Sequence, residues 1–147
     1  MKKDSLPPIT ARNIKLAHAA SSDAIRERLA EFSAVLETGD DFRFWEEMVY
    51  CFFTGGCSAK MGLRSIEKVR HLLLKGSQKQ LANALSGTHR YPFARSRYIV
   101  ESRNFLHADC DLQLRARLLA FTDPHERRDW LVREKGIKGL GYKEASH

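Results

Sequence analysis

The sequence has little of what holds small secreted domains together or binds metal ions. It contains only three cysteines, Cys51, Cys57 and Cys110, and no C-x-x-C pair. An odd count with this spacing argues against a disulfide framework or a zinc knuckle, and it favours reduced, buried thiols. The six histidines do not cluster, and no H-E-x-x-H motif occurs. We therefore expect neither a metal site nor a cofactor.

Long apolar runs are missing as well. The longest, Met48 to Phe53, is far too short to cross a bilayer. The first residues, M-K-K-D-S-L-P-P, lack the apolar stretch of a signal peptide. The sequence therefore predicts a cytoplasmic protein without a membrane partner.

Positive charge is what the chain has in excess, with a formal net charge of +7. Such a charge raises the odds of a polyanionic partner, because lysines and arginines that neutralise phosphates release condensed counterions. Residues 60–79 contain six cations and one acid, and four arginines then face Glu101 alone: Arg90, Arg95, Arg97 and Arg103. A solvated helix face explains this clustering equally well.

Helix signals recur along the 147 residues, and no stretch combines strand alternation with hairpin signals. We predict a single all-α domain over residues 1–147, with residues 1–10 flexible. Ser22-Asp23, Asp40 or Asp41, Ser58, Ser77 and Asp123 are the candidate helix caps. The predicted helices cover residues 24–37, 42–53, 58–75, 77–85, 92–106, 109–121 and 124–133.

The segment I-K-G-L-G-Y-K-E-A-S-H, residues 137–147, places two glycines around one leucine. Glycine tolerates positive φ and lets backbone approach another molecule closely. The N–H groups of such a turn, with the start of the next helix, suit a phosphate. We therefore predict a helix-hairpin-helix turn over residues 136–142, in which Gly139, Leu140 and Gly141 hold a DNA backbone. An ordinary turn is the alternative.

Lys143 follows this turn at the start of a helix. A lysine in a first helical turn feels the positive end of the helix dipole, which disfavours its charged form. Such an amine can act as a nucleophile and form a Schiff base. At a hairpin that grips DNA, the carbon to attack is deoxyribose C1′, with loss of the base and β-elimination of the 3′ phosphate. The alternative is a surface lysine that only contacts phosphate.

Three collinear segments resemble the archaeal-type 8-oxoguanine DNA glycosylase/AP lyases of the helix-hairpin-helix superfamily. They are F-W-E-E-M-V-Y-C-F-F-T-G-G-C-S-A (residues 44–59), T-H-R-Y-P-F-A-R-S-R-Y-I-V-E-S-R (residues 88–103) and the run D-W-L-V-R-E-K-G-I-K-G-L-G-Y-K (residues 129–143). The resemblance implies a glycosylase-like helical fold and base-excision repair of 8-oxoguanine, with Lys143 as the catalytic lysine.

By position, the resemblance also matches Gly139, Leu140 and Gly141 to the DNA-holding hairpin. Arg90, Arg95 and Arg97 are predicted to make further backbone contacts. The expected partner is double-stranded DNA with 8-oxoguanine or an abasic site, bound by a monomer near the nucleoid. Among the neighbours of these arginines, we expect a structural role for His89 and core positions for Tyr91, Phe93 and Tyr98.

The resemblance also implies that the helix begun by Lys143 continues and that a catalytic aspartate follows it. We therefore expect a C-terminally incomplete glycosylase domain whose activity alone is doubtful. Two further hypotheses remain open: a non-catalytic helix-hairpin-helix DNA-binding module, and a basic helical scaffold protein.

Overall fold

The computed structural model describes residue 6 and residues 8–147, and helices are the regular structure of this part of the chain. The prediction of an all-α protein is confirmed. The expected flexibility of residues 1–10 falls largely on residues 1–5 and 7, which lie outside the described residues. The chain separates into two compact units, one ending at Thr38 and the other spanning Gly39–His147.

The first unit consists mainly of α1, Ala11–Thr38, which has no buried residue within it. The helix starts much earlier than predicted, because Thr10 accepts a hydrogen bond from the Asn13 amide at its beginning. Ser22 and Asp23 lie inside this helix, so the prediction that they cap it is wrong. Among the described residues, no helix is long and apolar enough to cross a membrane.

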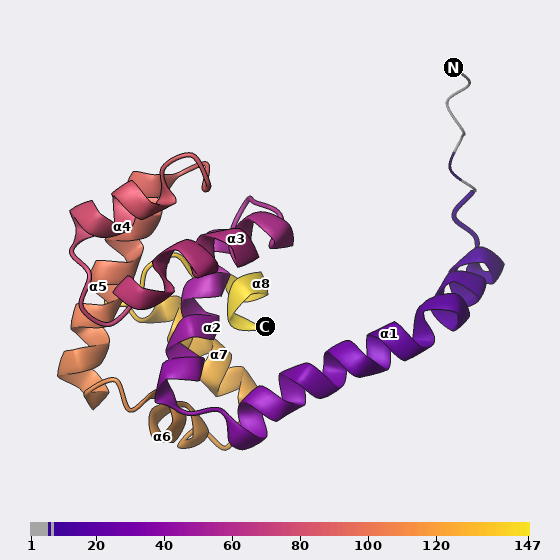
Figure 1. Ribbon diagram of the computed structural model, residues 1–147. Coiled ribbons are helices and arrows are strands. Elements are labelled where there is room, and N and C mark those ends of the chain that lie inside the picture. The colour runs from indigo at the N-terminus through magenta and orange to yellow at the C-terminus, as the bar shows by residue number, and fades with distance from the viewer. Residues whose placement is uncertain (1–5, 7) are drawn as a thin grey trace. The chain divides into compact units, whose positions relative to one another are not determined.

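The second unit is built from short helices, and their local signals explain most of their boundaries (Figure 1). Asp40, Ser58, Ser77 and Asp123 accept backbone N–H groups as N-caps, as predicted. The helices are α2 (Asp41–Thr54), α3 (Ala59–Val69), the 3₁₀-helix η1 (Arg70–Leu72), α4 (Gln78–Leu85), α5 (Pro92–Cys110), α6 (Leu114–Leu119), α7 (Pro124–Arg133) and α8 (Tyr142–Ala145).

One predicted helix is wrong. Residues 109 and 110 belong to the end of α5, and Asp111 and Leu112 then adopt positive φ angles of 50° and 55°. Left-handed backbone at two successive residues ends the helix, so a continuous helix over residues 109–121 cannot form. The chain becomes helical again only at Leu114.

Helix α2 is the central element of the second unit, since α3, α5, α6 and α8 pack against it. Trp45, Val49, Phe52 and Phe53 repeat at helical spacing and are at most 1% exposed. The Trp45 indole N–H donates to the Leu73 carbonyl at 3.1 Å, which ties α2 to the end of η1. Removing a large aromatic side chain from such a core costs about 3–5 kcal/mol. This packed helix is the frame against which the C-terminal segment is placed.

Candidate functional site

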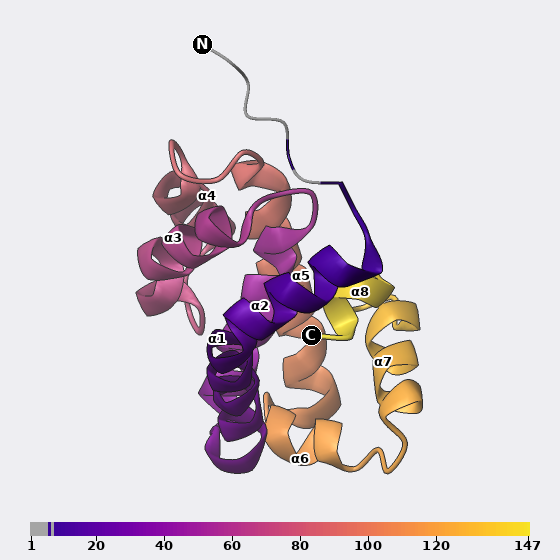
Figure 2. The same ribbon diagram turned by 90° about the vertical axis from the view of Figure 1, so that its right-hand side faces the viewer.

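The chain from α7 to α8 forms the predicted glycine turn, and α7 and α8 lie next to each other (Figure 2). Gly139 has a φ of 87°, which a residue with a Cβ rarely adopts. Gly141 is the N-cap of α8, and its amide donates to Oε2 of Glu144 at 3.2 Å. A glutamate at the third helical position commonly returns to the cap amide in this way. Residues of the segment itself, Gly139 and the Gly141–Glu144 pair, therefore stabilise the turn.

Side chains of helix α5 contact the glycine turn. The Lys138 amide donates to Oγ of Ser102 at 2.9 Å. A Cβ on Gly139 would lie 2.6 Å from Cδ2 of Tyr98, and one on Gly136 would lie 2.1 Å from Cδ2 of Phe105. Two positions of the turn therefore need glycine because α5 leaves no room for a side chain.

Lys143 occupies the first turn of α8 with its side chain 78% exposed. Its Nζ lies 3.3 Å from Oε1 of Glu144, whose own side chain is only 13% exposed. Burial acts to raise the pKa of Glu144. Hydrogen bonds from its own amide and from Lys143, the charge of Lys143, and the Gly141 amide outweigh burial and leave that pKa below its usual value. The Lys143 side chain thus lies in solvent beside an ionised carboxylate.

Glu144 therefore contacts both parts of the predicted site. One carboxylate oxygen accepts from the Gly141 amide and the other faces Lys143. Leu140, between the glycines, packs against the hydrophobic core with Ile137, which is 6% exposed. A phosphate at this turn would meet Gly139 and the start of α8, because Glu144 already engages the amide of Gly141. Sequence reasoning missed Glu144, although its position three residues after Gly141 is itself a capping signal.

The three predicted arginines have different surroundings. Arg90 and Arg97 are exposed, and each guanidinium lies over the ring of an adjacent tyrosine at 5.4 and 5.7 Å. Arg95 is half-buried and donates from Nη2 to the Gly55 carbonyl at 2.7 Å. Arg103, counted with them in the charge run, is buried and donates to carbonyls of Leu72, Leu73 and Gly76. Two of the four arginines of this run therefore face solvent.

His89 is 5% exposed and joins two backbone segments. Its Nε2 lies 2.9 Å from the Phe53 carbonyl, and its Nδ1 accepts from the Tyr91 amide at 3.0 Å. These partners require a neutral ring protonated at Nε2. Burial lowers the pKa of His89, and the nearby charge of Arg95 adds to this effect, against the hydrogen bond to Phe53. These contacts are those of a structural histidine.

The predicted core positions near this histidine are only partly correct. Tyr98 packs against the core, whereas Tyr91 is 42% exposed and Phe93 is 76% exposed. The prediction is wrong for the last two, which are the N-cap and a first-turn residue of α5 and have much of their surface in solvent.

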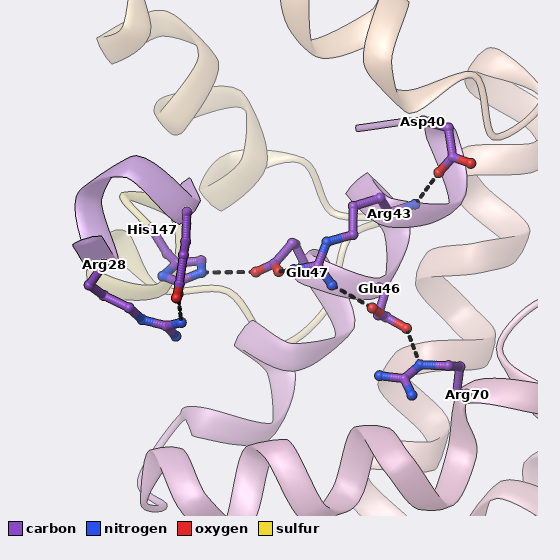
Figure 3. A network of polar contacts seen from close by, with 8 residues as sticks. Arg28, Asp40, Arg43, Glu46, Glu47, Arg70 and His147 are labelled. Atoms are coloured by element: carbon purple, nitrogen blue, oxygen red, sulfur yellow. Dashed lines mark hydrogen bonds and ion pairs between the residues drawn. The ribbon is translucent and has the colours of Figure 1, made fainter. Parts of the chain in front are cut away.

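A polar network on α2 holds the end of α8 (Figure 3). His147 Nε2 lies 3.0 Å from Oε2 of Glu47, and its ring is 5.6 Å from that of Tyr50. Arg43 pairs with both Glu47 and the buried Glu46. The last described residue is therefore attached to the central helix through side chains that are themselves fixed.

Comparison with protein families gives one match over most of the chain. The model of the 8-oxoguanine DNA glycosylase family with a helix-hairpin-helix motif matches residues 25–147. An 8-oxoguanine DNA glycosylase/AP lyase of Korarchaeum cryptofilum is 37% identical over 135 residues, which cover 91% of this chain and 60% of that protein. A protein of the same name from Thermotoga maritima is 32% identical, with 84% and 56% covered.

Solved structures agree with the sequence relatives. The crystal structure of the Thermotoga maritima 8-oxoguanine DNA glycosylase is similar with a TM-score of 0.79 at 29% identity, covering 92% of this chain and 62% of that one. The Methanocaldococcus jannaschii glycosylase/lyase, solved with a 15mer DNA containing 8-oxoguanine, gives a TM-score of 0.75 at 28% identity, with 86% and 57% covered. The chain thus spans about 60% of the length of the curated relatives it matches.

Proposed function

We propose that this chain acts on damaged DNA through Lys143, as a glycosylase and AP lyase. The proposal proceeds from its family, since the chain belongs to the 8-oxoguanine DNA glycosylases. The observation that carries this proposal is the position of Lys143: an exposed amine in the first turn after a glycine hairpin. The family assignment agrees with the three segments identified in the sequence. The partner we propose is duplex DNA with 8-oxoguanine or an abasic site.

The chemistry follows from a nucleophilic amine next to a DNA backbone. A damaged base must leave the stack before its sugar can be reached. Nζ of Lys143, having lost a proton, forms a bond to deoxyribose C1′ while the bond to the base breaks. The departing base keeps the electrons of that bond and takes up a proton. The nitrogen then loses a proton, and its lone pair forms the C1′=N bond while the C1′–O4′ bond breaks and O4′ takes up a proton. The resulting ring-opened imine loses a proton from C2′, and the electrons of that C–H bond expel the 3′ phosphate. The N–H groups at Gly139 and at the start of α8 are proposed to hold the strand during these steps.

Borohydride trapping tests the enzyme assignment. The full chain is incubated with an abasic duplex or an 8-oxoguanine duplex in the presence of borohydride, and covalent adducts are separated on a denaturing gel. We expect an adduct with the unchanged chain and none with Lys143→Gln, because only a Schiff base is reduced to a stable bond. Lys138→Gln is the matched control, since Lys138 is also exposed in the same turn. An adduct that survives Lys143→Gln would contradict the proposed nucleophile.

A non-catalytic DNA-binding module is the second candidate, favoured by one observation. Nζ of Lys143 lies 3.3 Å from Oε1 of Glu144 in the DNA-free chain, and a lysine held beside a carboxylate favours a purely electrostatic role. The module predicts DNA affinity whose logarithm falls linearly with the logarithm of salt concentration, without any adduct. Affinity that is negligible at all salt concentrations would contradict both candidates and favour the scaffold hypothesis. The further proposals of a monomer and of a nucleoid location are tested by size-exclusion chromatography and by cell imaging.

A further inference from the structure

Arg95 connects two glycine turns that are far apart in the sequence. Its Nη2 donates to the carbonyl of Gly55, forty residues away, in the turn between α2 and α3. Its guanidinium carbon lies 5.3 Å from the centroid of the Tyr98 ring, one helical turn further along α5. The ring of Tyr98 in turn fills the space beside Gly139, where a Cβ would come within 2.6 Å of it. A continuous line of contacts therefore runs from the first turn through α5 to the hairpin.

The surroundings of Arg95 differ from those of a phosphate-binding arginine. Its side chain is half-buried, and its Nε atom is buried without a hydrogen-bond partner among the described residues. A second ring, that of Tyr91, lies 5.4 Å from the same guanidinium carbon. A planar guanidinium can lie against aromatic rings while one of its N–H groups donates to a carbonyl, whereas an ammonium is a strongly hydrated point charge. The site thus requires the shape of arginine as well as its charge.

We propose that Arg95 is a positioning residue that fixes the Tyr98 ring beneath Gly139 and so sets the geometry of the hairpin that carries Lys143. Its effect on reaction rate rests on the proposed function, whereas its effect on Gly139 does not. A shift of about 1 Å at a catalytic group can change a rate by about 10²-fold. Loss of the Arg95 contacts is therefore expected to slow the chemistry without changing the number of cations that bind phosphates, and so without changing the salt dependence of DNA binding.

The first test measures the hairpin in DNA-free protein by NMR. Gly139 lies beside the Tyr98 ring, so the chemical shift of its amide should report the position of that ring. Tyr98→Leu calibrates the signal by removing the ring. Arg95→Lys should move the Gly139 resonance toward the Tyr98→Leu position. Arg97→Lys is the matched control, because Arg97 also lies over the Tyr98 ring but is exposed at the surface, and it should move the resonance much less.

The second test asks whether lysine can replace arginine in the trapping reaction. At saturating abasic duplex, Arg95→Lys and Arg95→Gln should both slow adduct formation by about ten- to hundredfold. Their salt dependence of DNA binding should stay within experimental error of the unchanged chain. A phosphate contact predicts the opposite: Arg95→Lys retains the rate, and Arg95→Gln reduces the salt slope by about 0.9.

The outcomes separate this inference from the proposed function. If the unchanged chain forms no adduct but Arg95→Lys moves Gly139, the positioning role holds and the enzyme assignment fails. A Gly139 resonance that is unaffected by Arg95→Lys, in a variant that melts cooperatively, overturns the positioning role. Full recovery of the trapping rate by Arg95→Lys overturns it equally.

Discussion

Two cations of the second unit, Arg103 and Lys143, show how differently the same charge can be used. Arg103 is buried in the middle of α5 and donates to three carbonyls at the end of η1 and beyond, at 3.4, 3.1 and 2.7 Å. Lys143 is 78% exposed in the first turn of α8 and faces one carboxylate. Arg103 donates to carbonyls that have no N–H partner within a helix, whereas Lys143 is exposed and can contact another molecule. Burial and hydrogen-bond partners, rather than position in a charged run, distinguish these two cations.

Replacing these two cations should give the largest contrast in stability. Arg103→Leu removes three hydrogen bonds from a charged donor, each of which contributes about 1.5–3 kcal/mol, while relieving the cost of a buried charge. Burial lowers the pKa of Arg103, which reflects that cost. We expect a net loss of about 3–4 kcal/mol in the free energy of unfolding, measured by urea denaturation. Lys143→Gln, an exposed change, should stay within about 0.5 kcal/mol.

Arg103→Lys sharpens this contrast. A lysine keeps the charge but has a single nitrogen, which cannot reach three carbonyls in the arrangement of a guanidinium. Its stability should lie between those of the unchanged chain and Arg103→Leu. Equal stability of Arg103→Leu and Lys143→Gln would show that the buried contacts contribute nothing.

The hairpin offers a second comparison, between two glycines with similar positive φ angles. Gly139 and Gly87 have φ angles of 87° and 78°, but a Cβ on Gly87 would have no atom within 4 Å. Gly87→Ala should therefore lower the free energy of unfolding only by the strain of left-handed backbone, about 1–2 kcal/mol. Gly139→Ala should cost about 1 kcal/mol more, because the methyl group meets Tyr98 in an already filled space. Thermal denaturation of both variants measures the difference.

If the two glycine variants lose equal stability, the Tyr98 ring moves aside freely and does not constrain the backbone of the hairpin at Gly139. That result would also weaken the positioning role of Arg95, since a mobile ring cannot fix Gly139. Tyr98→Leu combined with Gly139→Ala provides the control, because the extra cost should disappear when the ring is removed.

The difference between local and long-range contacts explains what the sequence could predict. Helix caps act over two or three residues, so Asp40, Ser58, Ser77 and Asp123 were visible as local signals. The glycine hairpin and its lysine were visible for the same reason. The hydrogen bond from the Lys138 amide to Ser102 spans 36 residues, and the one from Arg95 to Gly55 spans 40. Such pairs depend on how helices pack, which periodicity does not specify.

The errors have related causes. Asp109 and the residues after it have good helix spacing, but tertiary packing places left-handed backbone at Asp111 and Leu112. A tyrosine and a phenylalanine at the start of α5 look like core residues until the exposure of that helix end is known. The contacts of Arg95 with Gly55 and two rings likewise depend on how the helices pack, which composition does not indicate.

The buried histidine of this unit should make stability depend on pH. The pKa of His89 is lowered in the folded state relative to the ordinary value of 6.5. The unfolded chain therefore binds the proton first as the pH falls, and folded-state stability declines below pH 6.5 toward the folded pKa. Urea midpoints between pH 8 and about 5 should show this decline. His89→Gln should flatten this part of the curve, whereas the exposed His71→Gln should not.

The smallest expected effect is on the reactivity of Cys51, a buried thiol of α2 that is influenced by Glu144 of α8. Burial raises the pKa of this thiol to about 12, with further contributions from the charges of Glu47 and Glu144. The thiolate is the reactive form, so Cys51 should remain unlabelled by iodoacetamide at pH 8 in native protein and react once urea unfolds the chain. Glu144→Gln removes the smallest of the three causes and should leave Cys51 protected, as mass spectrometry of labelled peptides can show. Rapid labelling in that variant would mean that the Glu144 contacts, and not the packing of α2, keep water away from this side of the hairpin.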